Sequence, residues 1–166
     1  MLKVFIDADA CPVKQEVYRV AKRYGLKVIL VSNAWMRTPR EDWIELIVVD
    51  GQLDAADDWI VAHVAKNDIV ITADIPLASR SLEKGSQVIS PTGRVFTEES
   101  IGEALATRNL LSQLREFGTM MGGPPPFGKR ERSRFLQRLD EAIQTIRRER
   151  PHTRRDVTGT PPKLCP

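Results

Sequence analysis

The fold of this chain is decided by short apolar runs that end in an acid, of which the clearest is Asp68-Ile69-Val70-Ile71-Thr72-Ala73-Asp74. Its centre is apolar without a break, which is typical of a strand covered by helices on both faces. The first residues have the same form, with Val4-Phe5-Ile6 followed by Asp7. Further strand-length runs are found at Lys27 to Val31, Glu45 to Val49 and Gln87 to Ile89. We therefore expect five strands, with a turn at residues 91–93 leading the last into Val95-Phe96.

Helical patterns separate these runs. They extend from Pro12 to a stop at Gly25, from a cap at Asp54 to about Val64, and from about Pro76 to Glu83. Strands that alternate with helices indicate a parallel sheet with right-handed crossovers. The sequence therefore predicts an α/β fold with a central, mostly parallel sheet flanked by helices.

The remainder of the chain is predicted to be mainly helical. A helix is expected from about residue 98 to Phe117, followed by a Gly/Pro-rich loop at 118–128 and a last basic helix. We expect one domain over residues 1–148, including the helices from about 98. Residues 149–166 are expected to form a disordered tail, because they are rich in proline and lack an apolar period.

Composition points to a cytoplasmic protein. No apolar run approaches the roughly 20 residues that span a bilayer, and no export signal is seen. The two cysteines, Cys11 and Cys165, suggest no disulfide framework. Residues 1–128 carry 14 Lys and Arg against 17 Asp and Glu, whereas residues 129–166 carry 11 against 5. This asymmetry of charge has two interpretations. The basic end helps to hold a polyanion near a metal site, or it is simply a solvated charged helix with a tail. Nothing in the sequence fixes the oligomeric state.

Acids follow the strands on one edge of the predicted sheet. They are Asp7 and Asp9 after the first strand, Asp54 and Asp57 at the start of the helix after the third, and Asp74 after the fourth. Ligands of parallel sheets bind at this edge, where the strand order reverses. Two carboxylates about 4 Å apart repel by roughly 4 kcal/mol at an effective dielectric near 20, so the cluster needs a cation or raised pKa values.

Oxygen ligands without nearby histidine or cysteine favour Mg²⁺ or Mn²⁺. Metal ions held in this way serve phosphoryl chemistry. The alternative is that each of these aspartates is separately a helix cap or a turn residue. Asp58 points away from the apolar stripe of its helix and is expected to be a surface acid.

Other residues are candidates for weaker roles. Ser32 and Asn33 end the second strand and are suited either to orient a phosphate or to begin a turn. Lys14, Arg108 and Arg115 are candidate phosphate contacts, with a surface role as the default.

The remaining candidates are expected to be structural. Trp35 and Trp43 can stack on bases, but a role in covering the sheet edge is commoner. Cys11 is expected to be a buried small residue whose acidic neighbours raise its pKa. His63 is expected to be a packed core histidine.

The chain closely resembles a known family. Its motifs are, in order, Asp7-Ala8-Asp9-Ala10-Cys11-Pro12, Asp54-Ala55-Ala56-Asp57, Asp68 to Asp74 and Gly123-Pro124-Pro125-Pro126-Phe127. They resemble the YaiI/YqxD family of uncharacterised bacterial proteins over about residues 1–145. That family is similar to the PIN-like nuclease superfamily, whose domains carry an acidic metal site on a parallel sheet. The resemblance implies that Asp7, Asp54, Asp57 and Asp74 are the acids of such a site, and Asp9 belongs to the family's opening motif.

Three functions are consistent with these residues. The first is a metal-dependent ribonuclease or phosphodiesterase, in which Asp7, Asp57 and Asp74 hold the metal and Asp9 or Asp54 completes the shell or positions water. The basic final helix would then bind RNA or another phosphate-rich ligand. The second is a non-catalytic RNA-binding or adaptor protein. The third is a phosphatase similar to the haloacid dehalogenases, with Asp7 as nucleophile and Asp9 as acid/base.

Overall fold

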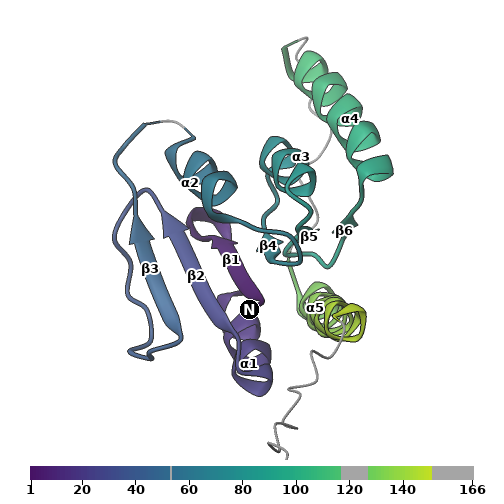
Figure 1. Cartoon of the computed structure of the whole chain (residues 1–166). Coiled ribbons are helices and arrows are strands. Elements are labelled where there is room, and N and C mark those ends of the chain that lie inside the picture. The colour runs from purple at the N-terminus through teal and green to yellow at the C-terminus, as the bar shows by residue number, and fades with distance from the viewer. Residues whose placement is uncertain (53, 117–126, 151–166) are drawn as a thin grey trace, which may run out of the picture.

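The computed structural model describes residues 1–52, 54–116 and 127–150. Six strands form one sheet in the order β3-β2-β1-β4-β5-β6 (Figure 1). The strands are β1 (Lys3–Asp7), β2 (Lys27–Ser32), β3 (Ile44–Val48), β4 (Ile69–Ile71), β5 (Gln87–Ile89) and β6 (Val95–Phe96). All neighbouring pairs are parallel except β5 and β6. The predicted mixed α/β class with a mostly parallel sheet is therefore confirmed.

The order in which strands are added to the sheet reverses between β1 and β4. From β1 the chain adds β2 and then β3 on one side, returns to the centre as β4, and adds β5 and β6 on the other side. Val4 pairs with Ile69 and Ile6 with Ile71, so the carboxyl ends of β1 and β4 lie next to each other. This is the topological switch point at which open α/β sheets bind ligands.

Two layers of helices cover the sheet. Helices α1 (Lys14–Tyr24) and α5 (Lys129–Glu149) lie on one face, and α2 (Ala55–His63), α3 (Ile75–Glu83) and α4 (Glu98–Glu116) lie on the other (Figure 1). Alternate residues of β1 divide between these layers: Val4 and Ile6 pack with α1 and α5, whereas Phe5 packs with α2, α3 and α4. Both faces of the strand are thus buried, as its unbroken apolar sequence predicts.

Some element boundaries differ from the sequence prediction. The helix expected from Pro12 begins at Lys14, after a short 3-10 turn, η1 (Ala8–Ala10). The third strand begins at Ile44 rather than Glu45. Gly25 ends α1 in the left-handed conformation at φ 65°, as a helix stop requires. Most of the predicted loop at 118–128 and of the tail at 149–166 lies outside the described residues.

The described helices contain no candidate for a membrane span, since none is both long enough and apolar enough.

Candidate functional site

The centre of the candidate site is a pair of strand ends joined by Thr72. Asp7 is the last residue of β1, and Thr72 follows β4 on the adjacent strand. The buried Thr72 hydroxyl donates to Asp7 Oδ2 at 3.0 Å, and Thr72 Oγ1 accepts the backbone N–H of Asp74 at 3.0 Å. The threonine therefore fixes Asp7 and Asp74 relative to each other. Sequence reasoning missed this role, although a polar residue that ends a buried strand was the signal for it.

Asp74 is also the N-cap of α3. Its Oδ1 accepts the backbone N–H of Leu77 at 2.9 Å. This contact agrees with the alternative that Asp74 is only a helix cap, because capping is a common role of aspartate. Capping occupies only one carboxylate oxygen, however, so it does not prevent a second contact through Oδ2.

The two acids of α2 behave differently from each other. Asp54 occupies the N-cap position, as predicted, but its φ is 69° and its side chain makes no capping hydrogen bond. The left-handed backbone explains this result, since capping side chains normally project from an extended residue. Asp57 is half-buried in the first turn of α2, a helix that packs against β1, β2 and α3. Asp58, by contrast, is 65% exposed and pairs with Arg80 at 2.8 Å, as expected for a surface acid.

These carboxyl groups act on one another electrostatically. Burial raises the pKa of Asp7, the hydrogen bond from Thr72 opposes this shift, and Asp9 and Asp74 raise the pKa further. Burial also raises the pKa of Asp57 to about 6, assisted by Asp74, Asp7 and Asp54 and opposed by Arg80. Acids from two strand ends and one helix are therefore close enough to disfavour one another's charge.

We call the sheet edge that carries Asp7, Asp54, Asp57 and Asp74 the acidic edge. Its oxygen ligands suit a hard cation such as Mg²⁺ or Mn²⁺. Its contributors are carboxylate oxygens whose mutual repulsion a divalent ion would relieve. Among the described residues, no three histidine, cysteine, aspartate or glutamate side chains are already arranged as a metal-ligand set. Metal binding here would thus require the acidic side chains to rotate toward a common point.

Asp9 is tied to the end of β2 through both of its carboxylate oxygens. Its Oδ1 accepts from the hydroxyl of Ser32 at 2.6 Å, and its Oδ2 accepts from the backbone N–H of Asn33 at 3.1 Å. Ser32 is fully buried at the end of β2. Ser32 and Asn33 therefore connect η1 to the second strand end, and Asn33 uses its backbone rather than its side chain.

Cys11 follows the turn η1 directly, and Lys14 begins α1 shortly after it. Lys14 Nζ donates to the carbonyl oxygen of Cys11 at 3.0 Å. Cys11 is buried, and burial raises the pKa of its thiol to about 11, with Asp7 and Glu16 adding to the shift. The expectation that Cys11 is a buried small residue is confirmed, and its thiol is a poor nucleophile at neutral pH.

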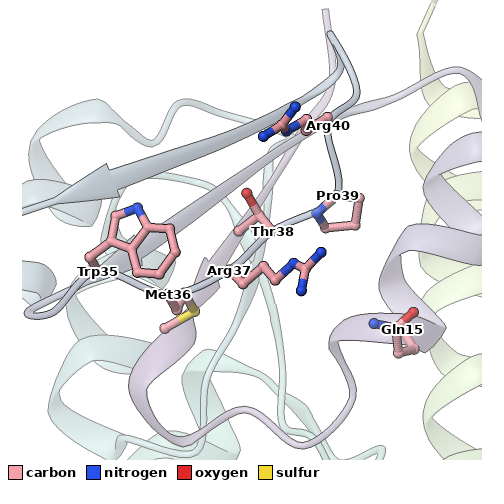
Figure 2. Close-up of a pocket in the computed structure, with 7 residues that line it drawn as sticks. All are labelled: Gln15, Trp35, Met36, Arg37, Thr38, Pro39 and Arg40. Carbon is pink, nitrogen blue, oxygen red and sulfur yellow. The ribbon is translucent and has the colours of Figure 1, made fainter.

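The predictions for the aromatic residues and for His63 are partly wrong. His63 is exposed rather than packed in the core. Its ring stacks on the ring of Trp59, with 3.7 Å between the two ring centroids. Trp43 is partly buried and meets Tyr18 edge to face, as a residue that covers the sheet does. Trp35 is 77% exposed and lines a hollow on the loop after β2, so it covers no part of the sheet (Figure 2).

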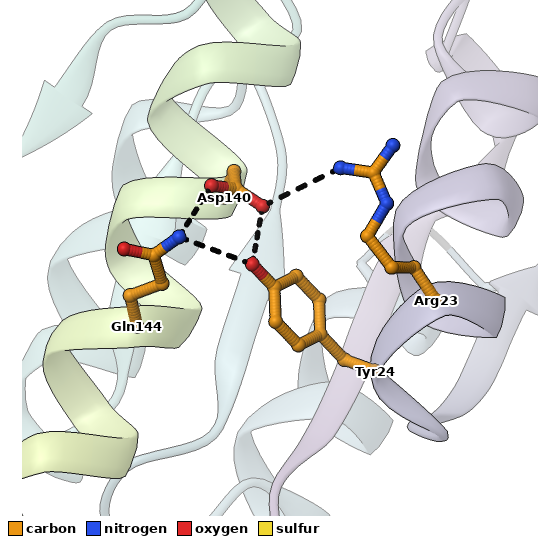
Figure 3. Close-up of polar contacts among 4 residues, drawn as sticks. All are labelled: Arg23, Tyr24, Asp140 and Gln144. Carbon is orange, nitrogen blue, oxygen red and sulfur yellow. Dashed lines mark hydrogen bonds and ion pairs between the residues drawn. The ribbon is translucent and has the colours of Figure 1, made fainter.

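The basic final helix is in large part a structural element. Phe135, Leu139, Ile143 and Ile146 of α5 are fully buried. A polar network fastens the helix to α1: Tyr24 donates to Asp140 at 2.5 Å, and Gln144 donates to Asp140 at 2.9 Å (Figure 3). Arg23 lies 3.8 Å from the same carboxylate.

The beginning of α5 lies at the carboxyl edge of the sheet. Arg132 Nη1 contacts the carbonyl oxygen of Pro12 at 3.0 Å and Glu16 at 2.9 Å. The first turns of α5 also pack on Gly93, which follows β5. The first turns of α5 therefore lie at the same edge of the sheet as the acids, against the segments that follow β1 and β5. The side chains of Arg108 and Arg115 in α4 lie outside the described part of the chain.

The fold and the site define a class: an α/β protein with a mostly parallel six-stranded sheet and an acidic cluster at its switch point. A family model described as "Uncharacterized BCR, YaiI/YqxD family" matches residues 5–145. The chain therefore belongs to the YaiI/YqxD family.

Curated relatives agree with this assignment. A UPF0178 protein of Brucella ovis is 54% identical over 146 residues, which cover 87% of this chain and 91% of that protein. A UPF0178 protein of Rhodospirillum centenum is 54% identical over 154 residues, which cover 90% of this chain and 100% of that protein. No solved structure matches the chain.

Proposed function

We propose that this protein is a metal-dependent phosphodiesterase of the PIN-like type that acts on RNA. The observation that carries the proposal is the convergence of Asp7, Asp57 and Asp74 from β1, α2 and the start of α3, where the charge of Asp74 raises the pKa of both Asp7 and Asp57. Isolated caps and turn acids have no reason to meet at the switch point of the sheet. Such a cluster is costly unless a cation compensates it, which makes it a candidate functional site.

In this proposal Asp7, Asp57 and Asp74 hold Mg²⁺ or Mn²⁺. A bound ion of this kind polarises the phosphate and lowers the pKa of water. Thr72 is a positioning residue, because its hydroxyl orients Asp7 and its oxygen anchors the backbone of Asp74. Asp54, whose side chain caps no helix, is suited to position water.

The role of Asp9 is to shape the rim of the site. Both of its oxygens already accept hydrogen bonds from the end of β2. These bonds weaken the case for the phosphatase alternative, in which Asp9 would be a free acid/base beside the nucleophile Asp7.

RNA is the proposed substrate because basic side chains lie near the acidic edge. Lys129, Arg130 and Arg134 are exposed in the first turns of α5, which contact the segments after β1 and β5. Affinity that depends on phosphate contacts falls steeply as salt rises. Binding of RNA by this protein should therefore weaken strongly between low and physiological ionic strength.

The test is cleavage of end-labelled RNA with Mn²⁺, comparing the wild type with Asp74→Asn and with the matched control Asp58→Asn. Asp58 is an acid of the same region that pairs with Arg80 on the surface. We expect cleavage by the wild type and the control and loss of cleavage in Asp74→Asn. Binding without cleavage by all three proteins would favour the adaptor alternative. A phosphoaspartate trapped at Asp7 would favour the phosphatase.

A further inference from the structure

A groove lies between α1 and the loop that joins β2 to β3. Its larger part is a hollow of about 860 Å³ lined by Gln15 of α1 and residues 35–40 of the loop (Figure 2). A smaller hollow of about 260 Å³ shares Gln15 and Pro39 with it and continues along α1 past Arg19 and Lys22. The two hollows adjoin at these shared residues, and we call them together the loop groove.

The loop groove begins beside the acidic edge of the sheet. The loop leaves β2 at Asn33, whose backbone N–H donates to Asp9. The next residue is fixed as well, because the N–H of Ala34 donates to Ser32 Oγ at 3.1 Å. Trp35 follows directly, so an anchored backbone presents the indole near the carboxyl ends of β1 and β2. On the opposite wall, Gln15 belongs to the first turn of α1, which also starts at this edge.

Trp35 is unusual among the tryptophans of the chain. It is 77% exposed, whereas Trp43 and Trp59 are partly buried against the core. A single exposed apolar residue is not remarkable by itself. Here, however, the indole lies in the same hollow as Arg37 and Arg40.

The charge of the loop groove is mainly positive. Arg37 and Arg40 line the larger hollow, and Arg19 and Lys22 line the smaller one, where Glu41 is the acidic member. All four basic residues are exposed, and none of them forms an ion pair with another described residue. Their charges are therefore available to an anionic ligand, and an acidic site lies at one end of the groove.

We infer that the loop groove binds single-stranded nucleic acid, with an unpaired base stacked on Trp35 and phosphates at Arg37 and Arg40. A basic groove with an aromatic platform is the combination by which proteins hold single strands without reading their sequence. A duplex cannot use it in the same way, because its bases are already stacked on one another. The inference rests on the proposed function only in taking a phosphodiester chain as the ligand, and it concerns binding outside the acidic residues.

The test measures binding in EDTA, so that it does not depend on metal or on cleavage. The probes are labelled oligouridylate and oligothymidylate of about 12 nucleotides, with a duplex of the same length for comparison. The variants are Trp35→Ala and the double variant Arg37→Gln/Arg40→Gln. The charge-matched control is Lys66→Gln/Lys84→Gln, which changes two exposed basic residues after α2 and α3 that belong neither to α5 nor to the loop groove.

We expect Trp35→Ala to weaken single-strand binding about tenfold, which is within the range for loss of one base stack. The arginine double variant should weaken binding and lower its salt dependence, whereas the control pair should have little effect. Quenching of tryptophan fluorescence by either single strand should disappear in Trp35→Ala. A preference for one of the two single strands would identify the natural sugar.

Unchanged single-strand affinity in Trp35→Ala, or equal weakening of duplex binding, would overturn the inference. An Asp74→Asn variant separates this failure from failure of the proposed function. If Asp74→Asn binds single strands like the wild type but does not cleave RNA, both proposals hold. If the wild type binds single strands through Trp35 but cleaves no RNA, only the loop groove is supported.

Discussion

Replacing Asp57 by asparagine should stabilise the protein at neutral pH in the absence of metal. The folded state raises the pKa of Asp57 from 3.8 to about 6, mainly through burial and the charges of Asp74, Asp7 and Asp54. The folded protein therefore holds a proton on this group more tightly than the unfolded chain does. Between pH 4 and 6 this difference makes stability fall as pH rises, and the penalty is complete above pH 6.

The size of the penalty follows from the shift. At about 1.4 kcal/mol per pKa unit, a rise from 3.8 to about 6 corresponds to roughly 3 kcal/mol. Asp57 is only half-buried, so solvent screening reduces this value to about 1 kcal/mol. A gain of about 1 kcal/mol raises the Tm of a domain of this size by about 3 °C.

The assay is thermal unfolding in EDTA at pH 4 and pH 7.5, comparing the wild type, Asp57→Asn and the surface control Asp58→Asn. We expect Asp57→Asn to melt about 3 °C above the wild type at pH 7.5 and at the same temperature at pH 4. Added Mn²⁺ should raise the Tm of the wild type more than that of the variant. A lower Tm for Asp57→Asn at pH 7.5, or an equal gain at both pH values, would refute the electrostatic reasoning.

Three further variants test other contacts. Thr72→Val removes the hydroxyl that donates to Asp7, so the pKa of Asp7 should rise and Mn²⁺ affinity at pH 7 should fall, as calorimetry would show. Tyr24→Phe removes the donor to Asp140 between α1 and α5, and urea unfolding should show a loss of about 1 kcal/mol. Gly93→Ala places a methyl group 2.9 Å from the α5 backbone at φ +87°, so the same measurement should show a loss of at least about 2 kcal/mol. A loss below about 0.5 kcal/mol in either unfolding experiment would contradict the contact concerned.

The sheet was predictable because its strands are short, apolar on both faces and separated by helical patterns. Val4 to Ile6 and Ile69 to Ile71 could be identified locally, and the crossover rule then placed Asp7 and Asp74 at one edge. The antiparallel direction of β6 and the packing of α5 on α1 depend on contacts distant in sequence. Local patterns do not determine such contacts.

The details of the candidate site were less predictable than its position. Thr72 was missed because its role depends on Asp7 of the neighbouring strand, 65 residues away in sequence. Asp54 is the N-cap as predicted, but the absence of its capping hydrogen bond could not be foreseen, because a positive φ is invisible in the sequence. His63 was misplaced because its ring stacks outward on Trp59, a choice that helical periodicity alone does not reveal.

The most direct test of the metal site is calorimetric titration with Mn²⁺ at pH 7. The proteins to compare are the wild type, Asp7→Asn, Asp74→Asn and the surface control Asp58→Asn, each first shown to be folded. If Asp7 and Asp74 hold the metal ion, the wild type and Asp58→Asn bind Mn²⁺, whereas Asp7→Asn and Asp74→Asn do not. No binding by the folded wild type at millimolar Mn²⁺, or equal binding by all four proteins, would contradict a metal site at the acidic edge.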